Sequence, residues 1–441
     1  MARNDPYPMF TTLDPHHFLN LRNKLILKGY EVEREKSEMF RVAFSPFGQN
    51  ADWGKNMQKE PIPIGDLNGR WSMIPLLFGD VPAGQTVSPA LAEARNVLFP
   101  TIPAGVAINN TNAIDPNQEL GFFTIPIKYK KHGLRFDISA QIIGDFGINI
   151  HTGVTDICQT VTGIIDLTCQ AKKPCNVDWT DGSSYKDSLP ELTKANVQQY
   201  LMHPLETIAT EIDLNIENFH KVSIEDICLS LYWRHSYEVN EDREGWPLFL
   251  ATPFCILEGT IATAKEKKPY KVFSLSHGNN GHDALGFTTG IDLDFFDTIE
   301  IGAEAGFNHF FSRNICDLPV PTSTYQSGIY PFKTNVRYSP GHNWHFAAKM
   351  QAYHFIDRLS MYFQYILIHH EQDKIQLKNY APAFKPEKLE KISSWKAQVA
   401  NVGFNYDISP YISLGFLWQA PISQRNTYRS SSIMVALNIT Y

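Results

Sequence analysis

Charged residues recur at alternate positions in segments whose other face is apolar. They are Arg41, Arg135, Asp137, Arg234, Asp292, Glu300, Glu304, Lys349 and Lys396. On strands that enclose a water-filled interior, these residues would form opposing walls of charge, which set a transverse field and tune ion passage. Alternatively, the charges pair and simply hold the interior together. Because a dry core would need every charge paired, the mixture favours a wet lumen.

No catalytic signature accompanies these charges. The chain has no GxSxG, HExxH or Walker A sequence and no GxGxxG between a strand and a helix. We therefore predict no enzymatic activity. The stretch HHEQD at His369–Asp373 has metal-ligand residue types, but the solvated end of a strand entering a loop explains it better. No metal and no cofactor are predicted.

The composition excludes some classes of protein. The net charge is −7, which argues against a nucleic-acid partner because such proteins usually carry a basic face. No window has the ~18 uninterrupted apolar residues of a membrane-spanning helix. The start, MARNDPYPMFTT, lacks the apolar run of a signal peptide, so export stays open. The six cysteines form no CxxC, and either free thiols or a bridge among Cys158, Cys169 and Cys175 fits the spacing.

The elements that must position the charges are strands. In 134–142, for example, Leu134, Phe136 and Ile138 alternate with Arg135 and Asp137. Because side chains alternate across a strand, one face is apolar and the other polar. The same alternation occurs in 40–45, 146–154, 229–234, 285–293, 299–308, 346–352, 361–367, 402–406, 412–418 and 433–441.

Three features favour a transmembrane β-barrel over a soluble two-sheet protein, which also alternates. The longer expected strands have the ~9–11 residues that a tilted strand needs to cross a bilayer. Their second face is polar or glycine, as in a wet interior. Aromatic residues gather near strand ends, as in interfacial girdles; they are Phe295, Phe296, Phe310, Phe311, Tyr411, Trp418 and Tyr441.

The C-terminal stretch IMVALNITY resembles the targeting strand of bacterial outer-membrane β-barrels. In that family the last residue is aromatic and apolar residues alternate before it. Ile433, Val435, Leu437, Ile439 and Tyr441 match this pattern. The resemblance implies the bacterial outer membrane, insertion by its insertion machinery, and a last strand that closes the barrel against the first. It also implies contact with membrane lipids and lipopolysaccharide, whose phosphate could meet the basic stretch KEKKP at Lys265–Pro269, although a solvated loop is the simpler interpretation.

Short and long connections alternate along the chain. The turns at 296–297, 356–358 and 407–411 are short, whereas 312–343 and 371–393 are long. Such barrels have short periplasmic turns and long outer loops, so the long segments are expected outside. The pattern predicts an all-β, closed antiparallel barrel of about twelve strands. Two further candidates, YKVFSLSHG and GFFTIPIKYK, leave about fourteen to sixteen strands open.

The domain organisation follows from the spacing of the strands. We predict an N-terminal helical segment at 1–35, as a plug or a periplasmic cap, and a barrel at 36–441. Large insertions are expected at 49–120 and 158–223, with short helices at PALAEARNVLF and at VQQYLMHPLETIATEI, which Pro204 breaks. Long loops of this kind are usually functional.

The function predicted first is a porin that passes small hydrophilic solutes by passive diffusion. One alternative is a substrate-specific transporter plugged by the N-terminal segment. The other is a structural, surface-lattice or adhesive protein in which the barrel is only an anchor. A homo-oligomer or a surface array is expected for all three functions.

Overall fold

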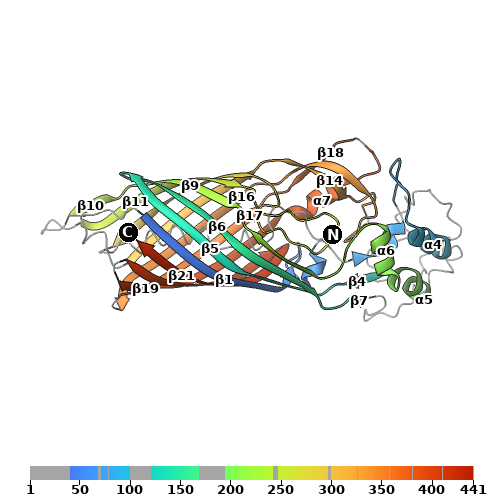
Figure 1. The fold of residues 1–441 in the computed structure, drawn as a ribbon, viewed down its shortest axis with the longest axis horizontal. Coiled ribbons are helices and arrows are strands. Elements are labelled where there is room, and N and C mark those ends of the chain that lie inside the picture. The colour runs from blue at the N-terminus through green and yellow to red at the C-terminus, as the bar shows by residue number, and fades with distance from the viewer. Residues whose placement is uncertain are drawn as a thin grey trace.

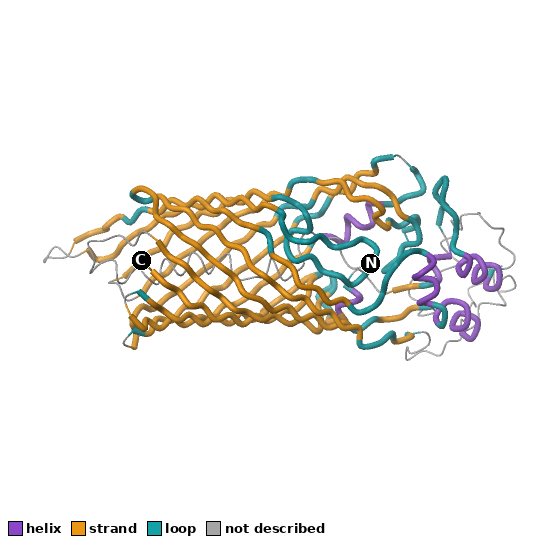
Figure 2. The backbone as a smooth tube through the Cα atoms, in the orientation of Figure 1, coloured by secondary structure: helices purple, strands orange, loops and turns teal. Residues whose placement is uncertain are grey.

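The chain forms a long barrel with a folded mass at one end. The computed structural model describes residues 40–67, 71–77, 79–99, 121–167, 194–241, 247–295, 299–324, 326–356, 358–379, 381–409 and 411–440. Strands wind around the cylinder, and helices and most loops gather at one end (Figures 1 and 2). The predicted N-terminal helical segment at 1–35 lies outside the described residues.

Twelve antiparallel strands of the described chain close the barrel. In chain order they are β1 (Phe40–Lys55), β5 (Ile127–Ile143), β6 (Phe146–Val161), β9 (Ile227–Arg234), β11 (Pro247–Ile261), β12 (Ala284–Phe295), β13 (Ile299–Phe310), β16 (Asn343–Ile356), β17 (Leu359–His370), β19 (Trp395–Ser409), β20 (Ile412–Arg425) and β21 (Thr427–Thr440). β8 (Phe219–Ile224) and β10 (Tyr237–Glu241) continue the course of β9 at its two ends. The predicted fold class is confirmed.

The barrel closes between the first and the last strand, as predicted. Val42 lies opposite Ile439, and Phe44 lies opposite Leu437. Every further neighbour in the ring is also antiparallel. Tight turns make this possible: Gly144 (φ 53°) turns β5 into β6, and Asn426 (φ 56°) turns β20 into β21. Both residue types adopt a left-handed backbone at low cost.

Alternation along each strand gives the barrel an apolar outside. In β13, Ile301 and Ala303 are exposed, whereas Glu300 and Glu304 are buried. Large apolar side chains are exposed around the whole ring, among them Phe44, Ile138, Val154, Leu231, Leu257, Phe287, Ile291, Phe346, Phe363, Phe404, Leu414 and Leu437. An apolar surface of this extent is the lipid-facing band of a transmembrane barrel. The inward residues of the same strands form a mostly polar lumen.

Several boundaries differ from the prediction. β1 continues to Lys55, so the first insertion begins after residue 55 rather than at 49. The second insertion lies between β6 and β8, at 162–218 rather than 158–223. Strands such as β5, with 17 residues, are longer than a bilayer needs because they continue into the folded mass. YKVFSLSHG is not a strand; it contributes one isolated bridge, between Asn215 and Lys271.

We call the described residues of the long connections 56–126, 162–218, 262–283, 311–342 and 371–394 the cap, and the opposite end of the barrel the turn end. The cap contains β2 (Pro61–Pro63), η1 (Ile64–Asp66), β3 (Trp71–Ser72), η2 (Ile74–Leu77), α4 (Pro89–Leu98), β4 (Phe122–Thr124), β7 (Ile165–Asp166), α5 (Lys194–Val197), η3 (Gln198–Met202), α6 (Leu205–Glu211), β14 (Arg313–Pro319), β15 (Lys333–Ser339), β18 (Lys374–Leu377) and α7 (Pro386–Ser393). The short helices predicted in the insertions are therefore present, and Pro204 separates η3 from α6.

Local sequence explains where the cap's best-defined helix begins. The Ser88 hydroxyl accepts a hydrogen bond from the Leu91 N–H at 3.3 Å, and Pro89 occupies the first helical position. Both are favoured at helix starts, where backbone N–H groups lack partners. The buried face of α4 then packs Leu91, Ala94 and Leu98 into the cap.

Three smaller observations complete the fold. Within the described residues, no helix is long and apolar enough to cross a membrane. Cys158, Cys228, Cys255 and Cys316 are free thiols, whereas Cys169 and Cys175 lie outside the described residues. Phe310 was expected in an aromatic girdle, but it is buried in the cap core because it shares the inward parity of β13.

The outward face of β13 gives a test of the barrel. Ala303 lies beside Ile291 and Ala348 on the lipid-facing side, so Ala303→Arg should reduce folding into liposomes by roughly 2–4 kcal/mol. Glu304→Gln, one residue away on the lumen side, should fold almost normally because Gln can still bond Gln364. Heat-modifiable gel mobility measures the folded fraction. Equal losses for the two variants would contradict the assignment of faces.

Candidate functional site

The structure places nearly all the predicted lumen residues inside the barrel. Buried, inward-facing positions are occupied by Arg41, Arg135, Asp137, Asp292, Glu300, Glu304 and Lys349. Arg234 is half-buried and has the inward parity of Ser230 on β9. Of the C-terminal residues, Ile433, Val435 and Leu437 are exposed on the outer face, Ile439 shares their parity, and Tyr441 lies outside the described residues.

Lys396 is the exception among the charged residues. It is exposed on β19 and shares the parity of Phe404 and Tyr406, which also face outward. Because side chains alternate strictly along a strand, Lys396 cannot share a face with the buried Asn401 and Asn405. The prediction that Lys396 lines the lumen is wrong.

The first wall of the lumen is basic and is formed by β1 and β5. Arg135 binds Glu225 with two bonds, at 2.7 and 2.9 Å, and Lys131 binds the same carboxylate at 2.7 Å. The Arg135 guanidinium also lies 4.1 Å from the centre of the Phe47 ring. Lys131 was missed by the sequence analysis, although it has the parity of Arg135 on the same strand. Glu225 was missed because it falls between β8 and β9, outside any regular strand.

The second wall is acidic and is formed by β12 and β13. Asp292 pairs with Lys349 of β16 at 2.8 Å. The Tyr353 hydroxyl donates to Glu300 at 2.8 Å, and the Gln364 amide donates to Glu304 at 2.9 Å. Around the twelve-stranded ring, β13 lies half a turn from β1, so the acidic and basic walls face each other across the lumen.

Glycine on an intervening strand lets both ion pairs form. Gly302 of β13 stands between Asp292 and Lys349 in register, and a Cβ there would collide with both side chains. Gly153 of β6 stands between Arg135 and Glu225, and its Cβ would lie 2.9 Å from Arg135 Cγ and 2.8 Å from Glu225 Oε2. Each ion pair therefore passes over a bare stretch of backbone. An inward-facing glycine between two charged strands was a signal available in the sequence.

Some lumen side chains have polar atoms without hydrogen-bond partners in the described part of the chain. They are Ser45, Asn149, Thr155, Gln159, Gln419 and Ser430, all buried and inward-facing. A buried polar group without a partner costs about 1–3 kcal/mol. The lumen therefore carries more hydrogen-bonding capacity than its own side chains use.

The cap core continues into the mouth of the barrel. Inward-facing strand residues such as Tyr129, Ile366 and Val399 belong to one apolar core together with Trp71 and Phe123 of the cap. The Tyr129 hydroxyl donates to the Phe273 carbonyl at 2.9 Å, which ties β5 to the connection 262–283. The barrel mouth at this end is thus lined by the same core that stabilises the cap.

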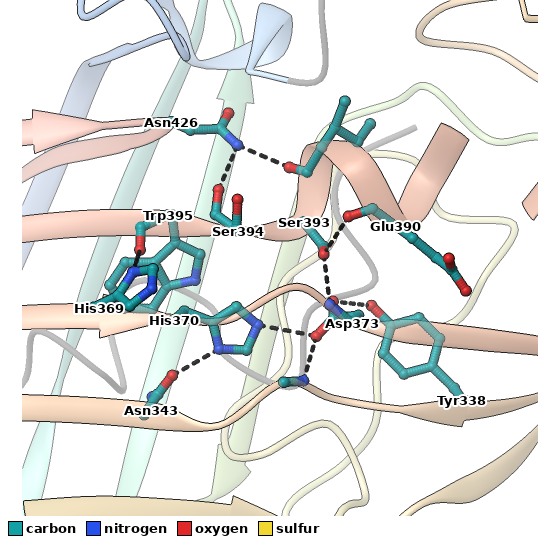
Figure 3. A network of polar contacts seen from close by, with 12 residues as sticks. Tyr338, Asn343, His369, His370, Asp373, Glu390, Ser393, Ser394, Trp395 and Asn426 are labelled. Carbon is teal, nitrogen blue, oxygen red and sulfur yellow. Dashed lines mark hydrogen bonds and ion pairs between the residues drawn. The ribbon is translucent and has the colours of Figure 1, made fainter. Parts of the chain in front are cut away.

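A buried polar network joins the cap to the barrel rim (Figure 3). His370, at the end of β17, bridges Asn343 at 2.6 Å and Asp373 at 2.9 Å. Asp373 also accepts bonds from the Tyr338 hydroxyl at 2.5 Å and the Gly341 N–H at 2.8 Å. We call these five residues the latch. Burial alone would raise the pKa of Asp373, but the charge of His370 and these hydrogen bonds hold it below its usual value.

The latch holds a small sheet above the rim. β14, β15 and β18 form this sheet, and its own apolar core includes Leu318, Val336 and Ile375. Asp373 precedes β18 and Tyr338 lies in β15, so the latch joins two connections to one point of the barrel. A group of three or more metal-ligating side chains able to hold an ion does not occur in the described residues, and the HHEQD stretch instead supplies this network.

Comparison with known proteins places the architecture in context. No family model matches the chain, and no curated protein matches its sequence. An outer membrane channel from Pseudomonas putida F1 is similar in structure, with 7% identity, a TM-score of 0.46, and coverage of 92% of this chain and 97% of that one. The translocator domain of the autotransporter NalP from Neisseria meningitidis has 7% identity, a TM-score of 0.33 and 96% coverage of each chain. The NanC porin has 9% identity, a TM-score of 0.31, and coverage of 70% and 94%.

All three TM-scores lie below 0.5 and all three identities are below 10%. The chain's own residues must carry any statement about function.

The glycine between the acidic wall and Lys349 gives a second test. Gly302→Ala should lower stability by roughly 1–3 kcal/mol, because the added methyl group overfills the crossing point and separates Asp292 from Lys349. Gly415→Ala is the matched control, since this lumen glycine would place its Cβ at an ordinary 3.4 Å from Ala436. Urea unfolding in detergent micelles measures both. If Gly415→Ala lowers stability as much as Gly302→Ala, the pairing of Asp292 and Lys349 over Gly302 does not explain the loss.

Two buried histidines give a pH test of the cap. Burial lowers the pKa of His277 and of His282 to about 4. The folded cap therefore favours the neutral rings, so its stability is complete above the ordinary pKa of 6.5 and is lost as the pH falls from there toward 4. The loss is about 1.4 kcal/mol per pH unit for each ring.

Limited proteolysis within 262–283 should accelerate at pH 5 relative to pH 7. The double variant His277→Gln/His282→Gln should lack this pH dependence, because Gln can donate to the Lys221 and Phe311 carbonyls without titrating. An unchanged pH profile in the variant would rule out these histidines as the cause.

Proposed function

We propose that this chain is a bacterial outer-membrane channel for the passive diffusion of small hydrophilic solutes, with the cap as its gate. The observation that supports this most is the polar lumen with unused hydrogen-bonding capacity. Ser45, Asn149 and Gln419 would each be satisfied by water in a conducting lumen. A barrel that served only as an anchor would be more stable with apolar residues at these positions.

The orientation follows from the connections. Barrels of this kind have short periplasmic turns and long outer loops, so the cap is outside and the turn end is periplasmic. On this proposal the outward apolar band contacts membrane lipids and lipopolysaccharide, and the C-terminal strand is read by the outer-membrane insertion machinery. The chain acts as a channel rather than as an enzyme. A homo-oligomer or array also stays a proposal.

The cap supports gating rather than a permanently open pore. The cap core reaches the inward residues of the mouth and closes that end of the barrel. Conduction therefore requires the cap to shift relative to the strand ends. The latch is the polar part of that joint, and weakening it should favour the open state.

A surface-binding role is the second candidate. It is favoured by the separate apolar core of the sheet β14–β15–β18, which makes part of the cap a folded surface module. On that proposal the barrel anchors the module and the lumen stays closed. Conductance separates the two candidates. The plugged-transporter alternative depends on 1–35, outside the described residues.

The latch provides the test of the gated channel. Reconstituted wild-type protein should show brief openings in planar bilayers, and Asp373→Ala should raise the open probability several-fold because it removes three bonds from the joint. Gln376→Ala, an exposed position on neighbouring β18, is the matched control and should behave as wild type.

Barrel folding of each protein is checked by heat-modifiable mobility. If folded wild type and both variants never conduct, the channel proposal fails and the surface-binding role gains support. If all three conduct equally, the channel stands but the latch is not its gate.

A further inference from the structure

Four lysines gather where the cap meets the barrel rim. Lys221 belongs to β8, and Lys265, Lys268 and Lys271 belong to the connection 262–283. The charges of the three loop lysines all act repulsively on Lys221. None of the four has an ion-pair partner within the described part of the chain. We call these four residues the rim cluster.

The nearby carboxylates are already engaged. Glu266 is bound by Arg313 at 2.5 Å, and Glu217 accepts a bond from the Asn215 amide at 2.9 Å. Neither carboxylate pairs with a lysine of the rim cluster within the described part of the chain, so the four ammonium groups stay available to a solute anion. Such a cluster attracts anions and raises their local concentration, by an effect that salt screens.

The backbone under the rim cluster is held in place. The Asn215 N–H donates to the Tyr270 carbonyl at 2.8 Å, and the Val272 N–H donates to the Asn215 carbonyl at 3.1 Å. These bonds flank the isolated bridge between Asn215 and Lys271. The Lys271 ammonium lies 5.9 Å from the centre of the Phe219 ring. The lysines are thus presented from a fixed frame.

Two members of the rim cluster, Lys221 and Lys271, face the barrel axis rather than the lipid. On β8, His220, Val222 and Ile224 are the exposed, outward-facing residues, whereas Lys221 has the inward parity of the buried Phe219 and Ser223. Lys271 packs over the same inward Phe219. This direction favours a soluble anion entering from the outside over a lipid phosphate beside the barrel.

Further cationic side chains lie inside the barrel, below the rim cluster. The His277 ring bonds the Lys221 carbonyl at 2.9 Å, and His277 is close enough to Lys131 to be affected by its charge. Lys131 and Arg135 then line the basic wall of the lumen. Cationic side chains therefore run from the rim cluster into the barrel on one side.

We propose that the rim cluster is an entry site for small multivalent anions that carry carboxylate or phosphate groups. Binding of the anion at the rim cluster does not depend on the proposed function. The site also makes such anions the preferred solutes of the channel, and this second role rests on the proposed function. The anion bridges several ammonium groups at once, and each further negative charge on it strengthens that attraction. Affinity therefore falls with added salt and with each lysine removed.

The test uses citrate and the full-length protein in detergent at low ionic strength. Lys265→Gln/Lys268→Gln/Lys271→Gln should bind citrate at least tenfold more weakly than wild type in isothermal titration calorimetry. The matched control is Lys374→Gln/Lys378→Gln/Lys391→Gln, which removes the same charge from exposed positions elsewhere in the cap. It should bind as wild type does. Equal citrate binding by the two variants, with folded barrels confirmed by gel mobility, overturns the proposal.

Two further arms separate the possible sources of the anion and the two proposals. If wild type binds lipopolysaccharide in a manner that depends on the three lysines but does not bind citrate, the rim cluster is a lipid site and the proposal is wrong. Liposome swelling with citrate and with the neutral sugar arabinose then tests transport. In Lys265→Gln/Lys268→Gln/Lys271→Gln, citrate uptake should fall and arabinose uptake should stay as in wild type. Citrate binding without uptake of either solute would refute the channel and leave the anion site intact.

Discussion

The interior of this barrel depends on burying charges in a narrow space. The twelve-stranded ring brings many charged side chains into one enclosed interior, and an unpaired buried charge there would be strongly destabilising. The structure meets this constraint with side chains from strands that are not neighbours. Asp292 reaches Lys349 over Gly302, and Arg135 reaches Glu225 over Gly153. The first crossing fixes β12, β13 and β16 relative to one another, and the second ties β5 and β6 to the link between β8 and β9.

A second consequence concerns the cap. The strands continue beyond the length needed to span a bilayer, and their inward residues change from polar to apolar toward the cap. Ile366 and Val399 therefore pack with Trp71 in one core, and the barrel mouth and the cap are stabilised together. Opening the mouth must expose part of this core, at about 25 cal/mol for each Å² of apolar surface. If the cap gates the lumen as proposed, the mouth would rest mostly closed and polar contacts such as the latch would adjust the balance.

Much of this architecture could be predicted because alternation is a strong local signal. The inward direction of Arg135 and Glu300 and the outward direction of Ile301 follow from a period of two. The pairing of the first and last strands followed instead from the resemblance of the C-terminal strand to those of outer-membrane barrels. The period of two, applied along the whole of β19, would have placed Lys396 outside. β11 was missed because Pro253 breaks the pattern of a strand. In the structure Pro253 lies opposite the break between β9 and β10, where a missing N–H is tolerated. Glu225 and the latch could not be predicted, because they join segments far apart in the sequence.

The distribution of charge links the lumen to the cap. The whole chain is acidic, with a net charge of −7, yet several of its basic residues line one path from the rim cluster to Lys131 and Arg135. At the first step inside the barrel, Lys131 and Arg135 share the carboxylate of Glu225, so two cations meet one anion. On the facing wall, Asp292 is matched by Lys349, and Glu300 is held by Tyr353. A solute anion would therefore be drawn along β5 and away from β13, because both the attraction and the repulsion act in the same direction across the lumen. Ion selectivity in such a lumen would depend on the charge of the wall that a solute passes, and less on the net charge of the protein.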